Sequence, residues 1–262
     1  MTSVRNLAAI TGASSGIGAV FARKLTATHD LLLIARRVDR LNALAEELRL
    51  QDSGMVELLP ADLTDQRQLA AVERRIASEK RLDLLVNNAG FGTRGQFWES
   101  AVETQAQMQL LNVHAVLRLS HAALGNMVPR RTGALINVAS VAGFVRRAGS
   151  AGYGASKAWV VAFTEALYLE MRRMGSPVKI QALCPGFTLT EFHNAMNIDR
   201  ERIAARPFWL QADHVVSESL KALPSGRLFV IPGWRYKLIV NLISTCPPFL
   251  RLAVGDYLSR RR

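Results

Sequence analysis

The stretch LAAITGASSGIG, residues 7–18, decides the fold of this chain. Its first five residues form an apolar run of strand length, and residues 17–28 have the pattern of a helix. Three glycines in the spacing GxxxGxG lie between the two. They allow a tight turn and let the backbone approach a pyrophosphate at the start of the helix, where free N–H groups favour anions. A merely flexible Gly/Ser turn is the alternative, but the position between a strand and a helix favours nucleotide binding.

Short apolar runs alternate with helical patterns along most of the chain. The predicted strands are residues 7–11, 31–35, 56–60, 82–87, 134–139, 179–183 and 228–231. The predicted helices are residues 17–28, 39–50, 65–79, 100–127, 152–174 and 212–222. The strands are apolar on both faces, as in a parallel sheet that helices cover on both sides. This order predicts an α/β fold with a doubly wound parallel sheet of about seven strands, in a single domain of residues 1–232.

Length and composition are those of a globular protein with a sizeable core. The chain has 262 residues, of which 49% are hydrophobic and 21% charged. The formal net charge of +12 comes mainly from 27 Arg against 6 Lys. The arginines are spread along the chain without a basic stripe interleaved with aromatic residues, so we expect a solvated surface and no nucleic-acid partner. The exception is the run Arg260-Arg261-Arg262.

Cysteine and histidine usage predicts no metal site. The two cysteines, Cys184 and Cys246, form no CxxC motif and no Cys/His cluster, which indicates a reducing compartment. Cys184 lies in an apolar run and is predicted to be a small core residue. His114 and His121 share one predicted helix, but no acid or Cys completes a ligand set. Because neither a signal peptide nor a membrane-spanning run is recognisable, we expect a cytoplasmic protein.

Residues 233–262 differ from the rest of the chain. Two strongly apolar segments, residues 238–243 and 249–258, flank Cys246-Pro247-Pro248. They predict an apolar C-terminal extension made of two short amphipathic helices. Such a pair of helices caps a substrate cleft, forms a partner interface or lies on a membrane surface, and the sequence leaves these three roles open.

Two arginines follow the second predicted strand. In dinucleotide-binding folds an Asp or Glu at this point accepts hydrogen bonds from the ribose 2′-OH of NAD. Here the run is Ile34-Ala35-Arg36-Arg37, and an arginine fork pairs with a 2′-phosphate, which predicts NADP(H). Arginines that face solvent at a helix start are the alternative. Asp62, after the third strand, suits either a hydrogen bond from the adenine amine or a helix cap.

A tyrosine and a lysine are one helical turn apart in Tyr153-Gly-Ala-Ser-Lys157. A phenol is a weak acid with a reference pKa of about 10, and an ammonium held beside it favours the phenolate. We therefore expect Lys157 to lower the pKa of Tyr153. The pair then suits proton exchange with a carbonyl or an alcohol.

Taken in order, these motifs resemble the short-chain dehydrogenase/reductase family over residues 5–232. The matching motifs are Thr11 to Gly18, Asp62, Asn87-Asn88-Ala89-Gly90, Asn112, Ser140, the Tyr153/Lys157 pair and Pro185-Gly186. The resemblance implies a Rossmann-type fold and an NADP-preferring oxidoreductase that moves a hydride between the nicotinamide and a carbonyl or secondary alcohol. It also implies homodimers or homotetramers built on the helices around residues 100–127 and 152–174.

The same resemblance implies roles for four residues. Tyr153 would be the general acid that protonates the substrate oxygen, and Ser140 would stabilise the charge that develops on that oxygen. Lys157 would hold the nicotinamide ribose hydroxyls and lower the pKa of Tyr153. Asn112 would anchor a water that links Lys157 to solvent for proton resupply.

A longer set of residues would bind the cofactor by this resemblance, with Asn88 and Gly90 on the adenosine side and Thr188 and Thr190 at the nicotinamide carboxamide. The full set is Gly12, Ser14, Ser15, Gly16, Ile17, Gly18, Arg36, Arg37, Asp62, Leu63, Asn88, Gly90, Tyr153, Lys157, Pro185, Gly186, Thr188 and Thr190. Ser15 stands where many NADP-using members carry a basic residue, so the preference for NADP(H) rests mainly on Arg36 and Arg37.

Three loops at the carboxyl ends of the strands are expected to choose the substrate: residues 91–98, 141–152 and 187–208. With Trp209 they supply Phe91, Phe97, Trp98, Phe144, Phe187, Phe192 and Phe208. An apolar wall suggests a lipophilic small-molecule ketone, aldehyde or alcohol, and core packing of these aromatics is the equally weighted alternative. Two other classes of function stay open: a nucleotide sensor without turnover, and a membrane-surface protein that acts through peripheral contact of its tail.

Overall fold

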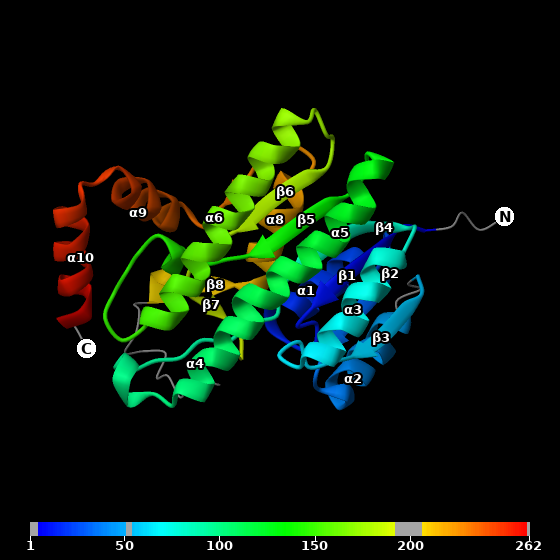
Figure 1. The fold of residues 1–262 in the computed structure, drawn as a ribbon, viewed down its shortest axis with the longest axis horizontal. Helices are drawn as coiled ribbons and strands as arrows, with labels where there is room; N and C mark the ends of the chain where they lie inside the picture. The colour runs from blue at the N-terminus through cyan, green and yellow to red at the C-terminus, as the bar shows by residue number, and fades with distance from the viewer. Residues whose placement is uncertain (1–4, 51–53, 192–205, 261–262) are drawn as a thin grey trace.

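A parallel seven-stranded sheet forms the centre of the molecule, in the order β3-β2-β1-β4-β5-β6-β9 (Figure 1). The computed structural model describes residues 5–50, 54–191 and 206–260. The strands are β1 Leu7–Thr11, β2 Asp30–Ala35, β3 Val56–Pro60, β4 Leu82–Asn87, β5 Ala134–Val138, β6 Lys179–Leu183 and β9 Phe229–Val230. All neighbouring pairs run parallel, which confirms the predicted doubly wound sheet.

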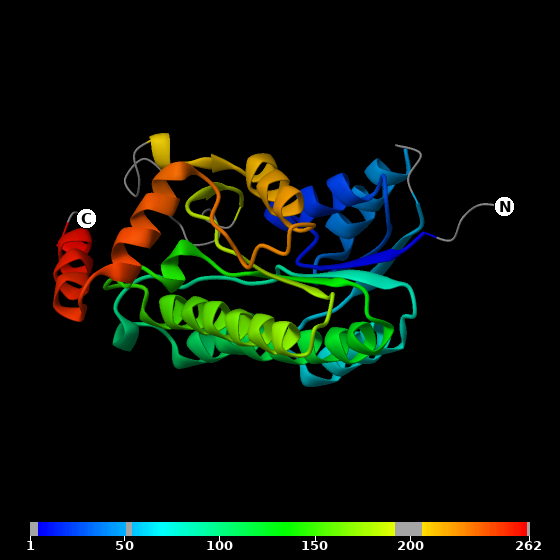
Figure 2. The ribbon, with the colours of Figure 1, turned by 90° about the horizontal axis from the view of Figure 1, so that it is seen from above.

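Helices cover both faces of the sheet, so that the fold has three layers (Figure 2). Helices α1, α2 and α8 lie on one face, and α3, α5 and α6 on the other. The helices of the described chain are α1 Gly16–Leu25, α2 Val38–Arg49, α3 Gln66–Ser78, α4 Val102–Gln109, α5 Val116–Arg130, α6 Ala151–Arg173, α8 Ala212–Ala222, α9 Trp234–Thr245 and α10 Pro248–Arg260.

The strands are apolar throughout because alternate residues enter two separate cores. In β1, Ala8 and Ile10 pack under the α1 layer, whereas Leu7 and Ala9 pack under the α3 layer. Successive side chains of a strand point to opposite faces of the sheet. In a sheet that is buried on both sides, polar and apolar residues therefore do not alternate along a strand. Each fully buried Leu or Ile contributes about 1.5–3 kcal/mol relative to an exposed one.

The helix predicted at residues 100–127 is interrupted, and in this detail the prediction is wrong. A π-helical turn, η2 Leu110–Ala115, separates α4 from α5. Such a turn inserts one extra residue into the helical ladder and often marks a functional site. Here it contains the fully buried Asn112.

A second, small sheet was not predicted from the sequence. Strands β7 Thr188–Leu189 and β8 Leu210–Gln211 pair in parallel. Strands of two residues carry no periodicity that a sequence pattern can reveal. Part of the predicted loop 187–208, including Phe192, lies outside the described residues.

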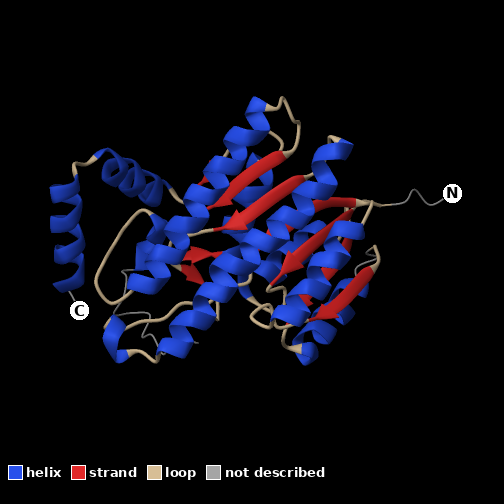
Figure 3. Ribbon diagram, in the orientation of Figure 1, coloured by secondary structure: helices blue, strands red, loops and turns tan. Residues whose placement is uncertain are grey.

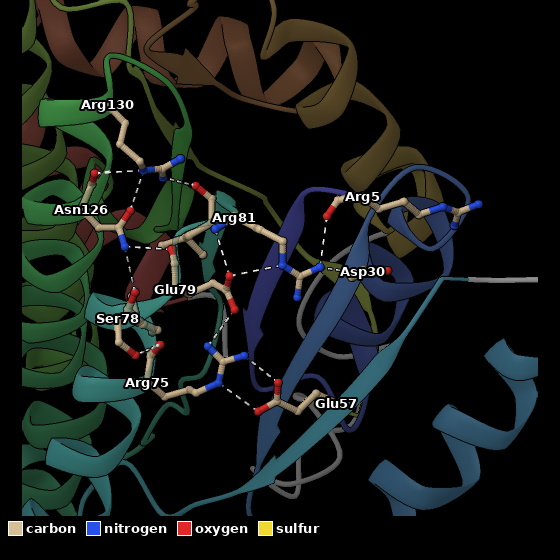
Figure 4. Close-up of polar contacts among 11 residues, drawn as sticks. Arg5, Asp30, Glu57, Arg75, Ser78, Glu79, Arg81, Asn126 and Arg130 are labelled. Atoms are coloured by element: carbon tan, nitrogen blue, oxygen red, sulfur yellow. Dashed lines mark hydrogen bonds and ion pairs between the residues drawn. The ribbon is translucent and has the colours of Figure 1, made fainter. Parts of the chain in front are cut away.

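A cluster of ion pairs lies at the amino ends of the central strands, away from the glycine turn (Figure 4). Arg81 pairs with Asp30 at 2.6 Å, and Arg75 bridges Glu57 at 2.6 Å and Glu79 at 2.9 Å. Asp30 is buried and Glu79 nearly so, so these carboxylates need the partners that the arginines supply. The pairs show that several arginines of this basic chain have acidic partners within the protein.

The two helices predicted in the tail are present as α9 and α10, at one end of the molecule (Figure 1). The inner side of α9 packs into a third apolar cluster through the buried Tyr236 and Val240, and Ile243 on the same side is also buried. The first part of the extension is therefore built into the body of the protein. No helix among the described residues combines the length and apolarity that crossing a bilayer requires.

Candidate functional site

The predicted site residues gather at the carboxyl edge of the sheet. In Figure 3 the arrowheads of the seven-stranded sheet point towards the side of the molecule where the C-terminal helix lies. Because the strands are parallel, the loops that follow β1, β2, β3, β4, β5 and β6 all open on this edge.

The glycine turn between β1 and α1 is tight. Gly12 and Gly16 have φ angles of +66° and +56°, in the left-handed region that favours glycine. A Cβ on Gly18 would lie 2.4 Å from the carbonyl oxygen of Gly12. Ser15 does not cap α1 with its side chain, and the first turn has no acidic residue. The helix N-terminus therefore offers backbone N–H groups and a positive dipole end to an anion.

Thr11 fastens this turn to the segment after β4, a role that sequence reasoning missed. Its hydroxyl accepts hydrogen bonds from the backbone N–H groups of Asn88, at 2.9 Å, and Ala89, at 3.0 Å. The Asn88 amide in turn donates to the Thr11 carbonyl at 2.9 Å. A buried threonine at the end of an apolar strand must find polar partners, and this was the available signal.

Arg37 reaches the glycine turn. Its guanidinium donates to the hydroxyls of Ser14, at 3.1 Å, and Ser15, at 2.7 Å, and it pairs with Glu191 at 3.2 Å. Arg40 also pairs with Glu191, and neither Arg40 nor Glu191 was predicted. Their contact joins residues too far apart in sequence for any local pattern to indicate it.

Arg36 is largely exposed and pairs with Asp62 at 3.4 Å. Asp62 accepts hydrogen bonds from the backbone and hydroxyl of Thr64, at 2.9 Å and 2.7 Å. Burial alone would raise the pKa of Asp62, but the bonds from Thr64 and the charge of Arg36 outweigh it and lower the pKa. The cap of α3 is Asp65, so the helix-cap alternative for Asp62 is wrong.

Ile17 and Leu63 contribute to the packing beneath this side of the site. Ile17 is half-buried against the core of the α1 layer. The side chain of Leu63 is buried in the core of the α3 layer. Any contact of Leu63 with a ligand above the sheet is therefore left to its backbone.

Ser140 and Tyr153 are brought together by a hydrogen bond between their side chains. Ser140 follows β5 and begins the short 3-10 turn η3 Val141–Gly143, where its hydroxyl accepts from the backbone N–H of Ala142 at 3.1 Å. Tyr153 comes from the first turn of α6. A phenol and a hydroxyl in contact can share one oxygen atom of a substrate between them.

The pKa of Tyr153 is raised to about 12 and not lowered as expected from Lys157. Burial of the phenol disfavours its charged form, and the hydrogen bond with Ser140 offsets only part of this effect. The phenol therefore keeps its proton at neutral pH.

Lys157 points past the phenol towards the sheet. Its ammonium donates to the carbonyl of Val138 at 2.8 Å and lies 6.0 Å from the centroid of the Tyr153 ring. Burial lowers the pKa of Lys157 to about 8. A Cβ on Gly90 would lie 3.6 Å from this nitrogen, which places Gly90 against the lysine.

Asn112 holds the loop after β4 in place. Its carbonyl oxygen accepts from the backbone N–H of Phe91 at 3.2 Å, and its amide donates to the Phe91 carbonyl at 2.9 Å. The amide also donates to Ser156 at 3.1 Å, one residue before Lys157. The π-helical turn η2 is what directs this side chain inward. The role predicted for Asn112 in holding a water stays a prediction.

The turn after β6 is held by a side chain from the tail. The Pro185 carbonyl accepts from the Ser140 hydroxyl at 3.4 Å. A Cβ on Gly186 would lie 2.0 Å from the ring of Tyr236, so only glycine fits beneath that ring. The Tyr236 hydroxyl accepts from the Phe187 N–H at 3.0 Å and donates to the Phe208 carbonyl at 2.7 Å.

Beyond this turn, Thr188 and Thr190 face different neighbours. Thr188 is buried and donates to the Gly186 carbonyl at 3.0 Å. Thr190 packs on the glycine turn, because a Cβ on Gly16 would lie 3.1 Å from the Cβ of Thr190. The structure thus brings the turn after β6 and the turn after β1 into contact.

The aromatic residues of the three loops divide into two groups. Phe144, Phe187 and Phe208 pack against the cluster that contains Tyr236, as the core-packing alternative predicts. Phe97 and Trp98 are exposed. Phe91 is half-buried beside Asn112.

The described residues contain no group of three or more His, Cys, Asp or Glu able to hold a metal ion. His114 is half-buried and His121 exposed. Cys184 is fully buried and burial raises its pKa to about 12, which confirms it as a core residue.

Comparison with known proteins identifies the family. The model of the short chain dehydrogenase family matches residues 6–201. The acetoacetyl-CoA reductase of Acinetobacter sp. (strain RA3849) is 32% identical over 201 residues, covering 75% of this chain and 80% of the reductase. The chain belongs to the short-chain dehydrogenases. The resemblance seen in the motifs is confirmed.

Solved structures of short-chain dehydrogenases share the whole fold. The short-chain dehydrogenase from Sphingobium yanoikuyae in complex with NADPH has a TM-score of 0.82 and 36% identity, covering 93% of this chain and 97% of its own. The bulky-bulky ketone specific alcohol dehydrogenase from Comamonas testosteroni has a TM-score of 0.79 and 29% identity, covering 94% and 96%.

In this short-chain dehydrogenase we expect Tyr236→Phe to lower the free energy of unfolding by about 1–3 kcal/mol, because the Phe187 N–H and the Phe208 carbonyl lose their common partner. The measurement is chemical denaturation followed by tryptophan fluorescence. Tyr168→Phe is the matched control, since the half-buried Tyr168 hydroxyl makes no hydrogen bond among the described residues. Equal stability of the two variants would contradict the role given to Tyr236.

Proposed function

We propose that the chain is an NADP(H)-dependent oxidoreductase that reduces the carbonyl of a lipophilic small molecule to an alcohol, with Tyr153 as the proton donor. The observation that carries the proposal is the hydrogen bond between the Ser140 and Tyr153 side chains, beside the buried ammonium of Lys157. These groups meet at the carboxyl edge of a doubly wound sheet, where ligands of such folds bind.

The glycine turn and its arginines fit a phosphorylated dinucleotide. Gly12, Gly16 and Gly18 let the turn before α1 pack tightly on its neighbours, and no acidic side chain occupies the first turn of the helix. Arg37 lies over Ser14 and Ser15 at the same place and carries the positive charge that a 2′-phosphate needs. A structural neighbour at 36% identity was solved with NADPH, which supports the same cofactor here.

The chemistry of the site is proton donation beside a hydride acceptor. When bound, the nicotinamide supplies the hydride. Tyr153 keeps its proton at neutral pH because burial raises its pKa to about 12, so it is a donor to a carbonyl oxygen that gains negative charge. The Ser140 hydroxyl, held by Ala142 and Pro185, stabilises the same oxygen.

Lys157 and Asn112 help to position Ser140 and Tyr153. The Lys157 ammonium is fixed by the Val138 carbonyl and provides a positive charge beneath the reacting oxygen. Asn112 binds both the loop after β4 and Ser156, and so fixes the start of α6 relative to that loop. Holding a water for proton resupply is proposed for Asn112 in addition.

The substrate proposed is a lipophilic ketone or aldehyde. Exposed Phe97 and Trp98 lie in the loop after β4. A structural neighbour is named for bulky ketones, which supports this class of substrate. A nucleotide sensor without turnover would need no phenol in contact with Ser140.

The proposal also covers the oligomeric state of the protein and its location in the cell. A homodimer or homotetramer built on α5 and α6 is supported by Leu117 and Leu169, which expose apolar side chains on these helices. A monomer at every protein concentration in sedimentation equilibrium would refute this. A cytoplasmic location with peripheral membrane contact through the tail is also proposed.

The decisive variant is Tyr153→Phe, which removes only the phenolic oxygen. We expect kcat for NADPH oxidation to fall by about 10²–10⁴-fold across a panel of medium-chain, steroidal and aromatic ketones, because general acid catalysis is lost. The affinity for NADPH, measured by fluorescence titration, should stay within about twofold. Tyr168→Phe is the control for the substitution itself. Full activity of Tyr153→Phe would sink the proposal, and no turnover of any panel ketone by the native protein would favour the sensor.

The pH dependence follows from Lys157. Its ammonium loses a proton as pH rises through about 8, while Tyr153, with a pKa of about 12, stays protonated. We expect kcat/KM for reduction to fall as pH rises through about 8, because the positive charge beneath the reacting oxygen disappears. The measurement is a rate profile from about pH 6 to about pH 10. A flat or rising profile would contradict this role, as would the same fall in Lys157→Met.

Cofactor preference should depend on Arg37. We expect Arg37→Gln to raise the Kd of NADPH by about tenfold to a hundredfold, because charge-assisted hydrogen bonds to the 2′-phosphate are lost. The Kd of NADH should change little. Arg49→Gln, at an exposed site near the end of α2, is the matched control. An equal loss of both cofactors would mean that Arg37 only shapes the turn through Ser14 and Ser15.

A further inference from the structure

Helix α9 is apolar on two opposite sides. Tyr236, Val240 and Ile243 are buried in the body of the protein. Trp234, Leu238 and Leu242 are 65%, 61% and 62% exposed. Their spacing of four residues places them along one stripe of the helix, away from the buried side. Packing within the chain therefore explains only half of the apolar character of α9.

Helix α10 extends this exposed apolar surface. Phe249 and Leu252 are 68% and 71% exposed, and Leu250 and Val254 are also exposed. We call the seven side chains on α9 and α10 the tail face: Trp234, Leu238, Leu242, Phe249, Leu250, Leu252 and Val254. They are seven of the 16 exposed large apolar side chains among the described residues. Soluble proteins rarely expose so many on two consecutive helices unless a partner covers them.

The sequence of the tail is strongly basic. Residues 234–262 contain six basic residues and one acidic residue, a net charge of +5. Arg235 stacks on Trp234 with its guanidinium carbon 4.7 Å from the ring centroid, so a cation borders the apolar stripe itself. A second copy of the same tail would bring like charges together and is disfavoured as the partner. An anionic lipid surface attracts them.

The lengths of the two helices point to the surface of a bilayer. Helix α9 has 12 residues and α10 has 13, and about 20 are needed to span the hydrocarbon core. Helices with an apolar side and flanking basic and tryptophan residues lie in the plane of the membrane interface.

Helix α10 adjoins the loop between Ser140 and Tyr153 through residues outside the tail face. The Ser259 hydroxyl of α10 accepts a hydrogen bond from the Ala148 N–H at 3.0 Å. A Cβ on Gly255 would lie 2.6 Å from the carbonyl oxygen of Arg146, so α10 touches this loop with its backbone. Figures 1 and 2 place α10 at the end of the molecule, outside α9.

We propose that the tail face docks the enzyme on an anionic lipid bilayer, with the loop at residues 146–148 next to the lipid. The docking itself is independent of the oxidoreductase activity. Its purpose, delivery of a lipophilic carbonyl compound from the membrane, rests on the proposed function.

The test is flotation of the full-length protein with phosphatidylcholine vesicles, with and without phosphatidylserine. We expect binding to the anionic vesicles that weakens with added salt. Leu242→Gln should lower the partition coefficient about tenfold, because its side chain leaves the acyl boundary. Leu50→Gln is the matched control, since Leu50 at the end of α2 is 88% exposed and lies outside the tail.

A charge variant separates the electrostatic part. Arg251→Gln should lower binding to anionic vesicles about fivefold and leave binding to neutral vesicles unchanged. Arg49→Gln should change neither. Equal binding to both vesicle types by the native protein would overturn the anionic partner.

Three results would overturn the docking proposal: no vesicle binding by the native protein, equal losses in Leu242→Gln and Leu50→Gln, or a dimer that Leu242→Gln dissociates while vesicles go unbound. In the absence of vesicles, the Leu242→Gln variant should catalyse the reduction of a water-soluble ketone at the rate of the native protein. Failure of the proposed activity is seen in the Tyr153→Phe assay and leaves the flotation result intact, so the two proposals fail separately.

Discussion

A lysine ammonium buried beside a parallel sheet is the constraint on which the site depends. Lys157 is only 6% exposed, and a charge in such a place is tolerated only if it is well hydrogen-bonded. Its partner is the Val138 carbonyl, and the glycine at position 90 leaves room for it. Three elements must therefore be correctly placed at once: the end of β5, the loop after β4 and the second turn of α6. The same placement brings Ser140 to Tyr153, so that packing around the lysine also orders the contact between the hydroxyl and the phenol.

Much of the fold could be predicted because its signals are local. Each strand of the central sheet is a continuous apolar run. Because helices cover both faces of the sheet, the side chains at odd and at even positions of a strand must both be apolar. The glycine turn also has a local signal, since Gly12 and Gly16 adopt backbone angles that other residues avoid. The alternation of strands and helices along the chain then predicted a doubly wound parallel sheet.

The details that could not be predicted depend on contacts between distant residues. The π-helical turn at Asn112 exists together with hydrogen bonds to Phe91 and Ser156, which no helical periodicity encodes. The pKa of Tyr153 rises because burial outweighs the hydrogen bond with Ser140, and the ammonium of Lys157 is directed to the Val138 carbonyl. In the tail, hydropathy marks α9 as apolar but cannot tell the side buried with Tyr236 from the side exposed with Leu238.

The contact between the Tyr236 ring and Gly186 also affects the order in which parts of the chain fold during synthesis. The turn after β6 is synthesised 49 residues before the hydroxyl that binds its Phe187 N–H. Strand β9, which completes the edge of the sheet beside β6, is likewise made after that turn. While the chain is still emerging from the ribosome, the sheet from β1 to β5 can form, but the turn has neither its ring nor its neighbouring strand. A nascent chain can therefore possess a folded sheet from β1 to β5 well before the turn after β6 is ordered.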